Sequence, residues 1–110
     1  MITTHILDLS RGKPAAGVPV TLDVRGDDGN WIHVGKGETD GDGRLMNLTS
    51  APLRNGTYRL TFDVATYFRE RRVATFFPEV IVVFHVADGE QHHHVPLLLS
   101  PWGYSTYRGS

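Results

Sequence analysis

The sequence predicts an all-β fold, an antiparallel β-sandwich formed as a single domain over residues 1–110. Two observations predict it. Apolar and polar residues alternate with a period of two along most of the chain, as in strands with one buried and one solvent-facing side. Clusters rich in Gly, Pro, Asp and Asn separate these stretches at regular intervals, as turns do between antiparallel strands. About seven or eight short strands at such spacing are typical of a sandwich.

The alternation predicts the individual strands, and the clearest is Thr57 to Val64, where Tyr58, Leu60 and Phe62 share one side. The turn residues Arg11–Pro14, Asp27–Asn30 and Thr39–Gly43 separate the earlier strands. Strands are expected over residues 3–9, 18–24, 31–35, 44–48, 57–64, 80–86 and 92–99, and the last six residues, 105–110, are expected to form a terminal strand.

Three segments depart from simple alternation. Residues 65–73 contain no turn residue and are predicted to form one short helix that stops before Pro78. Residues 80–86 are apolar on both faces, so this strand is expected to be covered on both sides, inside the sandwich or at a subunit interface. We expect it to pair with residues 92–99 after the turn at residues 87–90. Pro96 has no N–H, so one side of the later strand is expected to be locally unpaired there.

Composition excludes several classes of function. The chain has 11 basic and 12 acidic residues and a net charge of −1, which gives no basic surface for nucleic acid and no polybasic membrane patch. It has no cysteine, so disulfides and thiol catalysis are excluded. The longest apolar run, Val80 to Phe84, is far too short to span a bilayer, and the N-terminal residues lack the pattern of a secretory signal. We therefore expect a soluble, cytoplasmic protein with no membrane or nucleic-acid partner.

Histidine is abundant, with six in 110 residues. A lone strand histidine such as His5 is more often a surface residue or a hydrogen-bonded packing residue than a catalyst, and we interpret His33 and His85 in that way. His92 and His94 share a strand face, the pattern of a two-histidine metal site, but no third ligand is evident nearby, so no metal site is predicted.

The turn before Arg44 has the Asp-x-Asp pattern of a calcium loop. It lacks the glutamate at the twelfth position that such a loop needs, so a calcium site is rejected. By itself, Arg44 is interpreted as a solvated arginine just past this turn.

The C-terminal residues change this interpretation. His94 to Pro101, His-Val-Pro-Leu-Leu-Leu-Ser-Pro, and Tyr104 to Ser110, Tyr-Ser-Thr-Tyr-Arg-Gly-Ser, closely resemble the end of the 5-hydroxyisourate hydrolases. The opening Thr4-His5-Ile6-Leu7-Asp8 and the Thr39-x-x-x-Gly43-Arg44 segment also match this family, which shares its fold with the hormone carrier transthyretin. The resemblance covers nearly the whole chain.

This resemblance implies a transthyretin-like antiparallel sandwich of two four-stranded sheets with one short helix, assembled as a homotetramer around a central channel. It implies hydrolysis of 5-hydroxyisourate to 2-oxo-4-hydroxy-4-carboxy-5-ureidoimidazoline without metal or organic cofactor. The catalytic residues that it implies are His5, Arg44, His94 and Ser110. The substrate-binding residues that it implies are His5, Arg44, Tyr107 and Arg108.

These residue types suit the hydrolysis of a cyclic amide. A histidine titrates near neutral pH and can accept a proton from water, while an arginine presents a planar fork of donors to ring oxygens. His5 and His94 both remain possible bases, and Ser110 is either a nucleophile or a positioning group, the role that we favour. Two other functions stay open, a small-ligand carrier of the same fold and a structural sandwich. A carrier is expected to have apolar residues where this chain has His5, His94 and the terminal tetrapeptide.

Overall fold

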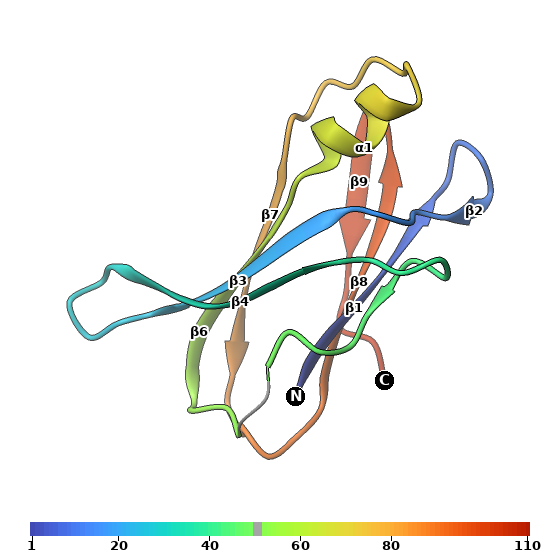
Figure 1. Ribbon diagram of the computed structural model, residues 1–110. Coiled ribbons are helices and arrows are strands. Elements are labelled where there is room, and N and C mark those ends of the chain that lie inside the picture. The colour runs from blue at the N-terminus through green and yellow to red at the C-terminus, as the bar shows by residue number, and fades with distance from the viewer. Residues whose placement is uncertain (50–51) are drawn as a thin grey trace.

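The computed structural model describes residues 1–49 and 52–110 and shows two β-sheets packed face to face, with a helix at one end (Figure 1). The predicted transthyretin-like sandwich with one short helix is confirmed. One sheet has the order β4-β3-β6-β7, with every neighbouring pair antiparallel. Its strands are β3 (Pro19–Arg25), β4 (Trp31–Glu38), β6 (Gly56–Phe62) and β7 (Val80–Val86).

The other sheet has the order β2-β1-β8-β9, and the short strand β5 also pairs with β1. Its strands are β1 (Ile2–Asp8), β2 (Lys13–Pro14), β5 (Arg44–Leu45), β8 (His93–Ser100) and β9 (Gly103–Thr106). The pairing of β1 with β8 is parallel, whereas β1 pairs with β2 and β5, and β8 pairs with β9, in antiparallel fashion. The N-terminal and C-terminal strands therefore lie in the same sheet, and the two chain ends are close together in Figure 1.

The core lies between the sheets and is built from the alternating apolar side chains. Leu22, Leu60, Ile6 and Leu97 have no exposed surface. Burying each such side chain contributes roughly 1.5–3 kcal/mol. A shift of one residue would turn every buried side chain of a strand to the solvent side, so this burial fixes the register of the strands. The polar residues that alternate with the apolar ones therefore face outward.

Helix α1 (Val64–Glu70) starts one residue before the predicted helix and ends three residues earlier. Asp63 caps it by accepting the N–H of Thr66 at 3.2 Å. Tyr67 and Phe68 face the core, and Arg72, with a φ of 58°, ends the helical path.

The prediction that residues 80–86 pair with residues 92–99 is wrong. The loop after β7 crosses from one sheet to the other, so β7 pairs with β6 while β8 lies between β1 and β9. In β7, Ile81 and Val83 are 46% and 50% exposed, so the strand is not covered on both sides within one chain. The expected cover inside the sandwich is therefore not found for this outer side of β7.

Pro96 interrupts the pairing of β8 with the C-terminal residues, as its missing N–H predicts. The β8–β9 ladder runs as far as the Leu97–Thr106 pair, and pairing resumes at a single bridge between His94 and Gly109. The chain end is therefore held along β8 beyond the end of β9. No helix in the described residues is both long and apolar enough to cross a membrane.

Candidate active site

Three of the predicted site residues lie on one face of the β1–β8–β9 sheet. His5 on β1 is paired with Arg44 on β5, and His94 on β8 is paired with Thr3. Residues paired across neighbouring strands point to the same side of a sheet. Since Ile2, Thr4 and Ile6 face the core, the paired residues His5, Arg44 and His94 share the opposite face, which we call the outer face.

The turn before β5 holds Arg44 in place. Asp40 Oδ1 accepts the backbone N–H groups of Asp42 and Arg44, both at 2.9 Å. The hydrogen bond from the Arg44 backbone, the largest favourable cause, lowers the pKa of the Asp40 carboxyl below its usual value, and the charges of Arg44 and His5 act in the same direction. Asp40 therefore stays ionised and keeps Arg44 at the start of β5.

Gly43 allows this turn to pack against β1. Its φ is 75°, and the N–H of Ile6 donates to its carbonyl oxygen at 2.8 Å. A Cβ at this position would lie 2.6 Å from the Ile6 carbonyl oxygen, closer than real side chains come. Glycine is needed here for both reasons, backbone conformation and close approach.

His94 is half-buried and is held as a neutral imidazole. Burial lowers its pKa below the usual value, and the nearby His92, Arg44 and His5 lower it further. Its Nδ1 atom lies 2.8 Å from the hydroxyl oxygen of Thr3. A neutral imidazole beside an arginine can accept a proton at neutral pH.

The chain end packs directly on His94. The N–H of Gly109 donates to the His94 carbonyl oxygen at 2.8 Å. A Cβ on Gly109 would lie 2.7 Å from His94 Cδ2 and 3.2 Å from Pro96 Cγ, so only glycine fits against the ring. Ser110, which is exposed, follows Gly109 directly, so the end of the chain lies next to His94. Tyr107, two residues before Gly109, is 57% exposed.

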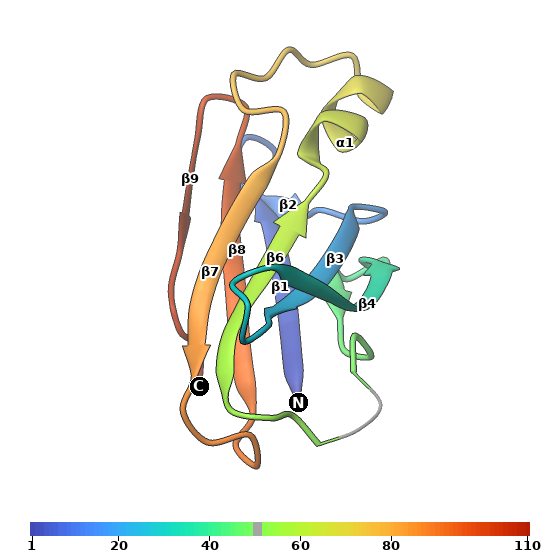
Figure 2. The same ribbon diagram turned by 90° about the vertical axis from the view of Figure 1, so that its left-hand side faces the viewer.

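The structure does not bring Arg108 into this group. Thr106 and Gly109 keep the same register along β8, which sets Arg108 opposite the core-facing Val95. Arg108 lines a cavity of about 220 Å³ at the edge formed by β7 and β9, together with His85 and His93. These two strands lie along one edge of the sandwich in Figure 2. The guanidinium donates to the Gln91 side-chain oxygen at 3.2 Å.

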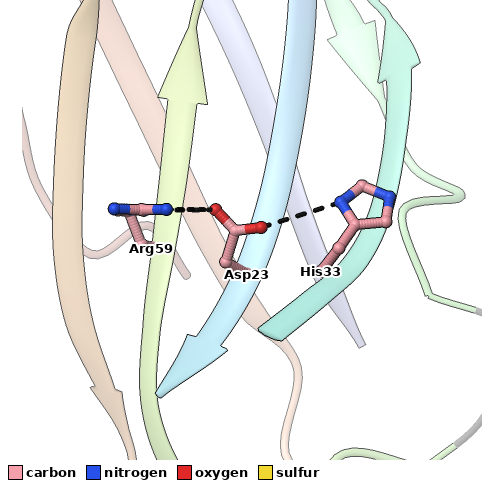
Figure 3. A network of polar contacts seen from close by, with 3 residues as sticks. All are labelled: Asp23, His33 and Arg59. Carbon is pink, nitrogen blue, oxygen red and sulfur yellow. Dashed lines mark hydrogen bonds and ion pairs between the residues drawn. The ribbon is translucent and has the colours of Figure 1, made fainter. Parts of the chain in front are cut away.

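Two of the other histidines lie on the far sheet. His33 Nδ1 is 3.6 Å from Asp23, whose carboxylate accepts two N–H groups of Arg59 (Figure 3). His85 contacts the hydroxyl of Thr57 at 3.3 Å. Both are exposed and lie on the other sheet from His5 and His94. Among residues 1–49 and 52–110, no three metal-ligating side chains form a cluster.

Sequence reasoning missed Thr3. Its hydroxyl oxygen contacts His94 and also His92 Nε2, at 2.7 Å, although the residue has no exposed surface. The only available signal was its position on the same face as His5, two residues away on a predicted strand. The parallel pairing of β1 with β8, which brings it to His94, cannot be inferred from that signal.

Comparison with known proteins shows the family to which this chain belongs. The model of the HIUase/Transthyretin family matches residues 2–109. The chain belongs to this family. A 5-hydroxyisourate hydrolase of Salmonella dublin is 47% identical, covering 100% of this chain and 81% of the relative. The mouse 5-hydroxyisourate hydrolase is 43% identical, covering 99% of this chain and 94% of the relative.

Solved structures of this family have the same fold. The 5-hydroxyisourate hydrolase of Klebsiella pneumoniae is 37% identical, with a TM-score of 0.88 over 99% of this chain and 98% of that one. Sea bream transthyretin in complex with thyroxine is 32% identical, with a TM-score of 0.93 over 98% and 93% of the two chains. The Salmonella dublin and mouse relatives, which are more similar to this chain than the transthyretin, are both hydrolases, and this confirms the prediction of a hydrolase.

Proposed function

We propose that this protein hydrolyses 5-hydroxyisourate to 2-oxo-4-hydroxy-4-carboxy-5-ureidoimidazoline during the degradation of urate. The observation that carries the proposal is the convergence of His5, Arg44 and His94 on one sheet face, with the chain end packed on His94. Relatives named 5-hydroxyisourate hydrolase, and a relative named uric acid degradation bifunctional protein from Arabidopsis thaliana at 49% identity, support the substrate. A cytoplasmic location stays a prediction of the sequence.

In the proposed reaction, His94 is the general base. Its lowered pKa keeps it neutral, so it can take a proton from water while the water oxygen bonds to the ring carbonyl carbon. The tetrahedral intermediate then collapses, the carbon–nitrogen bond of the ring breaks, and the proton passes from His94 to the leaving nitrogen. The product of this step is a single ring-opened molecule with a new carboxyl group, which releases the second proton of the water to solvent, and no metal or organic cofactor takes part.

The remaining residues bind and orient the substrate. The Arg44 guanidinium donates to substrate oxygens and stabilises the negative charge that develops during attack. His5, paired with Arg44, contacts the substrate from the neighbouring strand. Tyr107 and Ser110 contribute hydroxyl groups from the chain end, and Ser110 positions the substrate or water. A Ser110→Ala variant that retains most of its kcat excludes a nucleophilic serine, whereas a trapped acyl-enzyme in the parent protein would establish one.

The proposed assembly is a homotetramer in which the outer faces of two copies enclose the substrate. In one chain His94 is only half-buried and Arg44 is exposed, so a second copy is needed to exclude water from the reacting atoms. Exposed apolar side chains on β7 and β9, Ile81, Val83 and Tyr104, are available for contacts between copies. Arg108 lies away from the outer face of its own chain, so in this proposal it binds substrate only at a site formed between copies. Light scattering is expected to give four times the chain mass of 12.2 kDa.

An absorbance assay tests the reaction. Urate oxidase generates 5-hydroxyisourate in the cuvette, and its decay is followed with and without the protein. We expect acceleration by the parent chain and loss of at least about 100-fold in His94→Gln, His5→Ala and Arg44→Ala. His33→Ala, which removes an exposed histidine of the other sheet, is the matched control and should keep full activity. Decay at the spontaneous rate with the parent protein contradicts the proposal.

A further inference from the structure

The hydroxyl of Thr3 joins two histidines, one of which has no role in the proposed reaction. Thr3 Oγ1 lies 2.7 Å from His92 Nε2 and 2.8 Å from His94 Nδ1. Thr3 has no exposed surface and cannot replace these partners with solvent, whereas His92 is exposed. The contact therefore links a solvent-exposed imidazole to the proposed base through one buried hydroxyl.

A hydroxyl has one proton to donate and two lone pairs that can accept. Among the described residues the Thr3 hydroxyl contacts only these two histidines, so its proton must go to one of them, and two arrangements remain. In one, Thr3 donates to His94 Nδ1 and accepts from His92, which leaves the proton of His94 on Nε2. In the other, His94 Nδ1–H donates to Thr3, and Thr3 donates to His92. Only the second leaves a lone pair on His94 Nε2, the nitrogen that Thr3 does not occupy.

The charges of the outer face favour the second arrangement. Arg44 lies close enough to lower the pKa of His94, and its guanidinium can only donate hydrogen bonds. An unprotonated Nε2 suits such a neighbour, while an Nε2–H would oppose it. His5, the other neighbour on this face, can take either role.

We propose that Thr3 and His92 are positioning residues that hold His94 in the Nδ1–H tautomer, with Nε2 free as the base. This inference rests on the proposed function, because the free lone pair matters for turnover only if His94 is the base. The proton accepted from water enters at Nε2, and the Nδ1–H bond to Thr3 is kept in the resulting imidazolium. Neither Thr3 nor His92 touches the reacting atoms.

The tautomer is measured directly by nitrogen NMR of the chain labelled with ¹⁵N-histidine. Long-range proton–nitrogen correlations distinguish a protonated from an unprotonated ring nitrogen. We expect Nδ1–H at His94 in the parent and in Thr3→Ser, and a shift towards Nε2–H in Thr3→Val and His92→Phe. A parent His94 in the Nε2–H form, or a tautomer that is unchanged in Thr3→Val, overturns the proposal. An unchanged tautomer in His92→Phe alone removes His92 from it.

Kinetics provide the second readout. Losing one hydrogen bond of this kind predicts a fall in kcat of roughly 3- to 10-fold in Thr3→Val, with KM within about twofold and recovery in Thr3→Ser. Thr57→Val is the matched control, since Thr57 makes the same kind of contact with His85 on the other sheet. If Thr3→Val fails to fold, the tautomer of His94 in the parent chain still decides the proposal, and His92→Phe, at an exposed position, still tests the part of His92.

Failure of the proposed function gives a different result. If His94→Gln still hydrolyses the substrate at the parent rate, His94 is not the base, and the reaction proposed above is wrong. The NMR measurement does not depend on activity, so it still decides whether Thr3 and His92 set the tautomer of His94. An unchanged kcat in Thr3→Val, with His94 shown to be essential, refutes the positioning role itself.

Discussion

The contact between Gly109 and His94 gives the sharpest prediction, for the substitution Gly109→Ala. The added Cβ would lie 2.7 Å from His94 Cδ2 and 3.2 Å from Pro96 Cγ. Overpacking of this kind costs about 1–3 kcal/mol. The backbone hydrogen bond from Gly109 to His94 contributes only about 0.5–1.5 kcal/mol.

Comparing these magnitudes predicts how the strain is relieved. Since overpacking outweighs the hydrogen bond, the last residues detach from β8, and Ser110 loses its position beside His94. The chain remains anchored at Thr106, whose hydroxyl donates to the Pro96 carbonyl at 2.7 Å. We therefore expect kcat/KM to fall by roughly 10- to 100-fold, because misplacement of about 1 Å has effects of this size. The free energy of unfolding should fall by no more than about 1.5 kcal/mol, the contribution of the lost hydrogen bond, since the detached residues are largely exposed.

The assays are the decay of 5-hydroxyisourate and hydrogen exchange of the Gly109-position amide, which should lose its protection. Gly103→Ala, at the start of β9, is the matched control, because its Cβ would meet only Ser100 Oγ at 3.8 Å, an ordinary contact. Full activity and an unchanged amide in Gly109→Ala would refute the reasoning.

Three further predictions concern the turn, the pH dependence and the placement of Arg44. Gly43→Ala should lower the free energy of unfolding by about 2 kcal/mol or more, because the left-handed φ and the clash with Ile6 act together. The control Gly12→Ala, at a φ of 64° with nothing within 4 Å of the new Cβ, should lower it by only about 1–2 kcal/mol. Equal losses of the two variants in urea unfolding would contradict this prediction. Burial is the largest cause that lowers the pKa of His93 and of His94 below the usual value of about 6.5. Between the folded and the unfolded pKa values, the unfolded chain therefore binds protons that the folded chain does not. Stability should therefore be complete above about pH 6.5 and decrease as pH falls through the folded pKa values, and unfolding at pH 7.5 and pH 5 should show a smaller difference in His93→Phe. Asp40→Ala removes the acceptor of two backbone N–H groups, so Arg44 is held less firmly and kcat/KM should fall roughly 3- to 10-fold. Asp28→Ala, which removes a similar turn contact to the Asn30 N–H, is the control and should leave kcat/KM unchanged.

The sequence by itself determined the fold class and most strand positions. Alternation along residues 57–64 predicts β6 well, because a strand with one buried face requires a period of two. The family motifs also identified His5, Arg44 and His94 as candidates, and these three do share one face of a sheet. Local patterns suffice for such features because each depends on a residue and its near neighbours in the chain.

Only the tertiary structure decided which strands are neighbours. The turn after β7 was expected to form a hairpin, yet the chain crosses to the other sheet, and β8 pairs in parallel with β1 from the far end of the sequence. That long-range pairing brings Thr3 to His92 and His94. The register of the chain end along β8 sets Arg108 at the edge of the sandwich. The hydrogen-bonding groups of a strand accept many partners equally well. Which strands become neighbours is decided by the burial of the apolar faces of both sheets against each other. This burial depends on the whole chain and cannot be inferred from a local pattern.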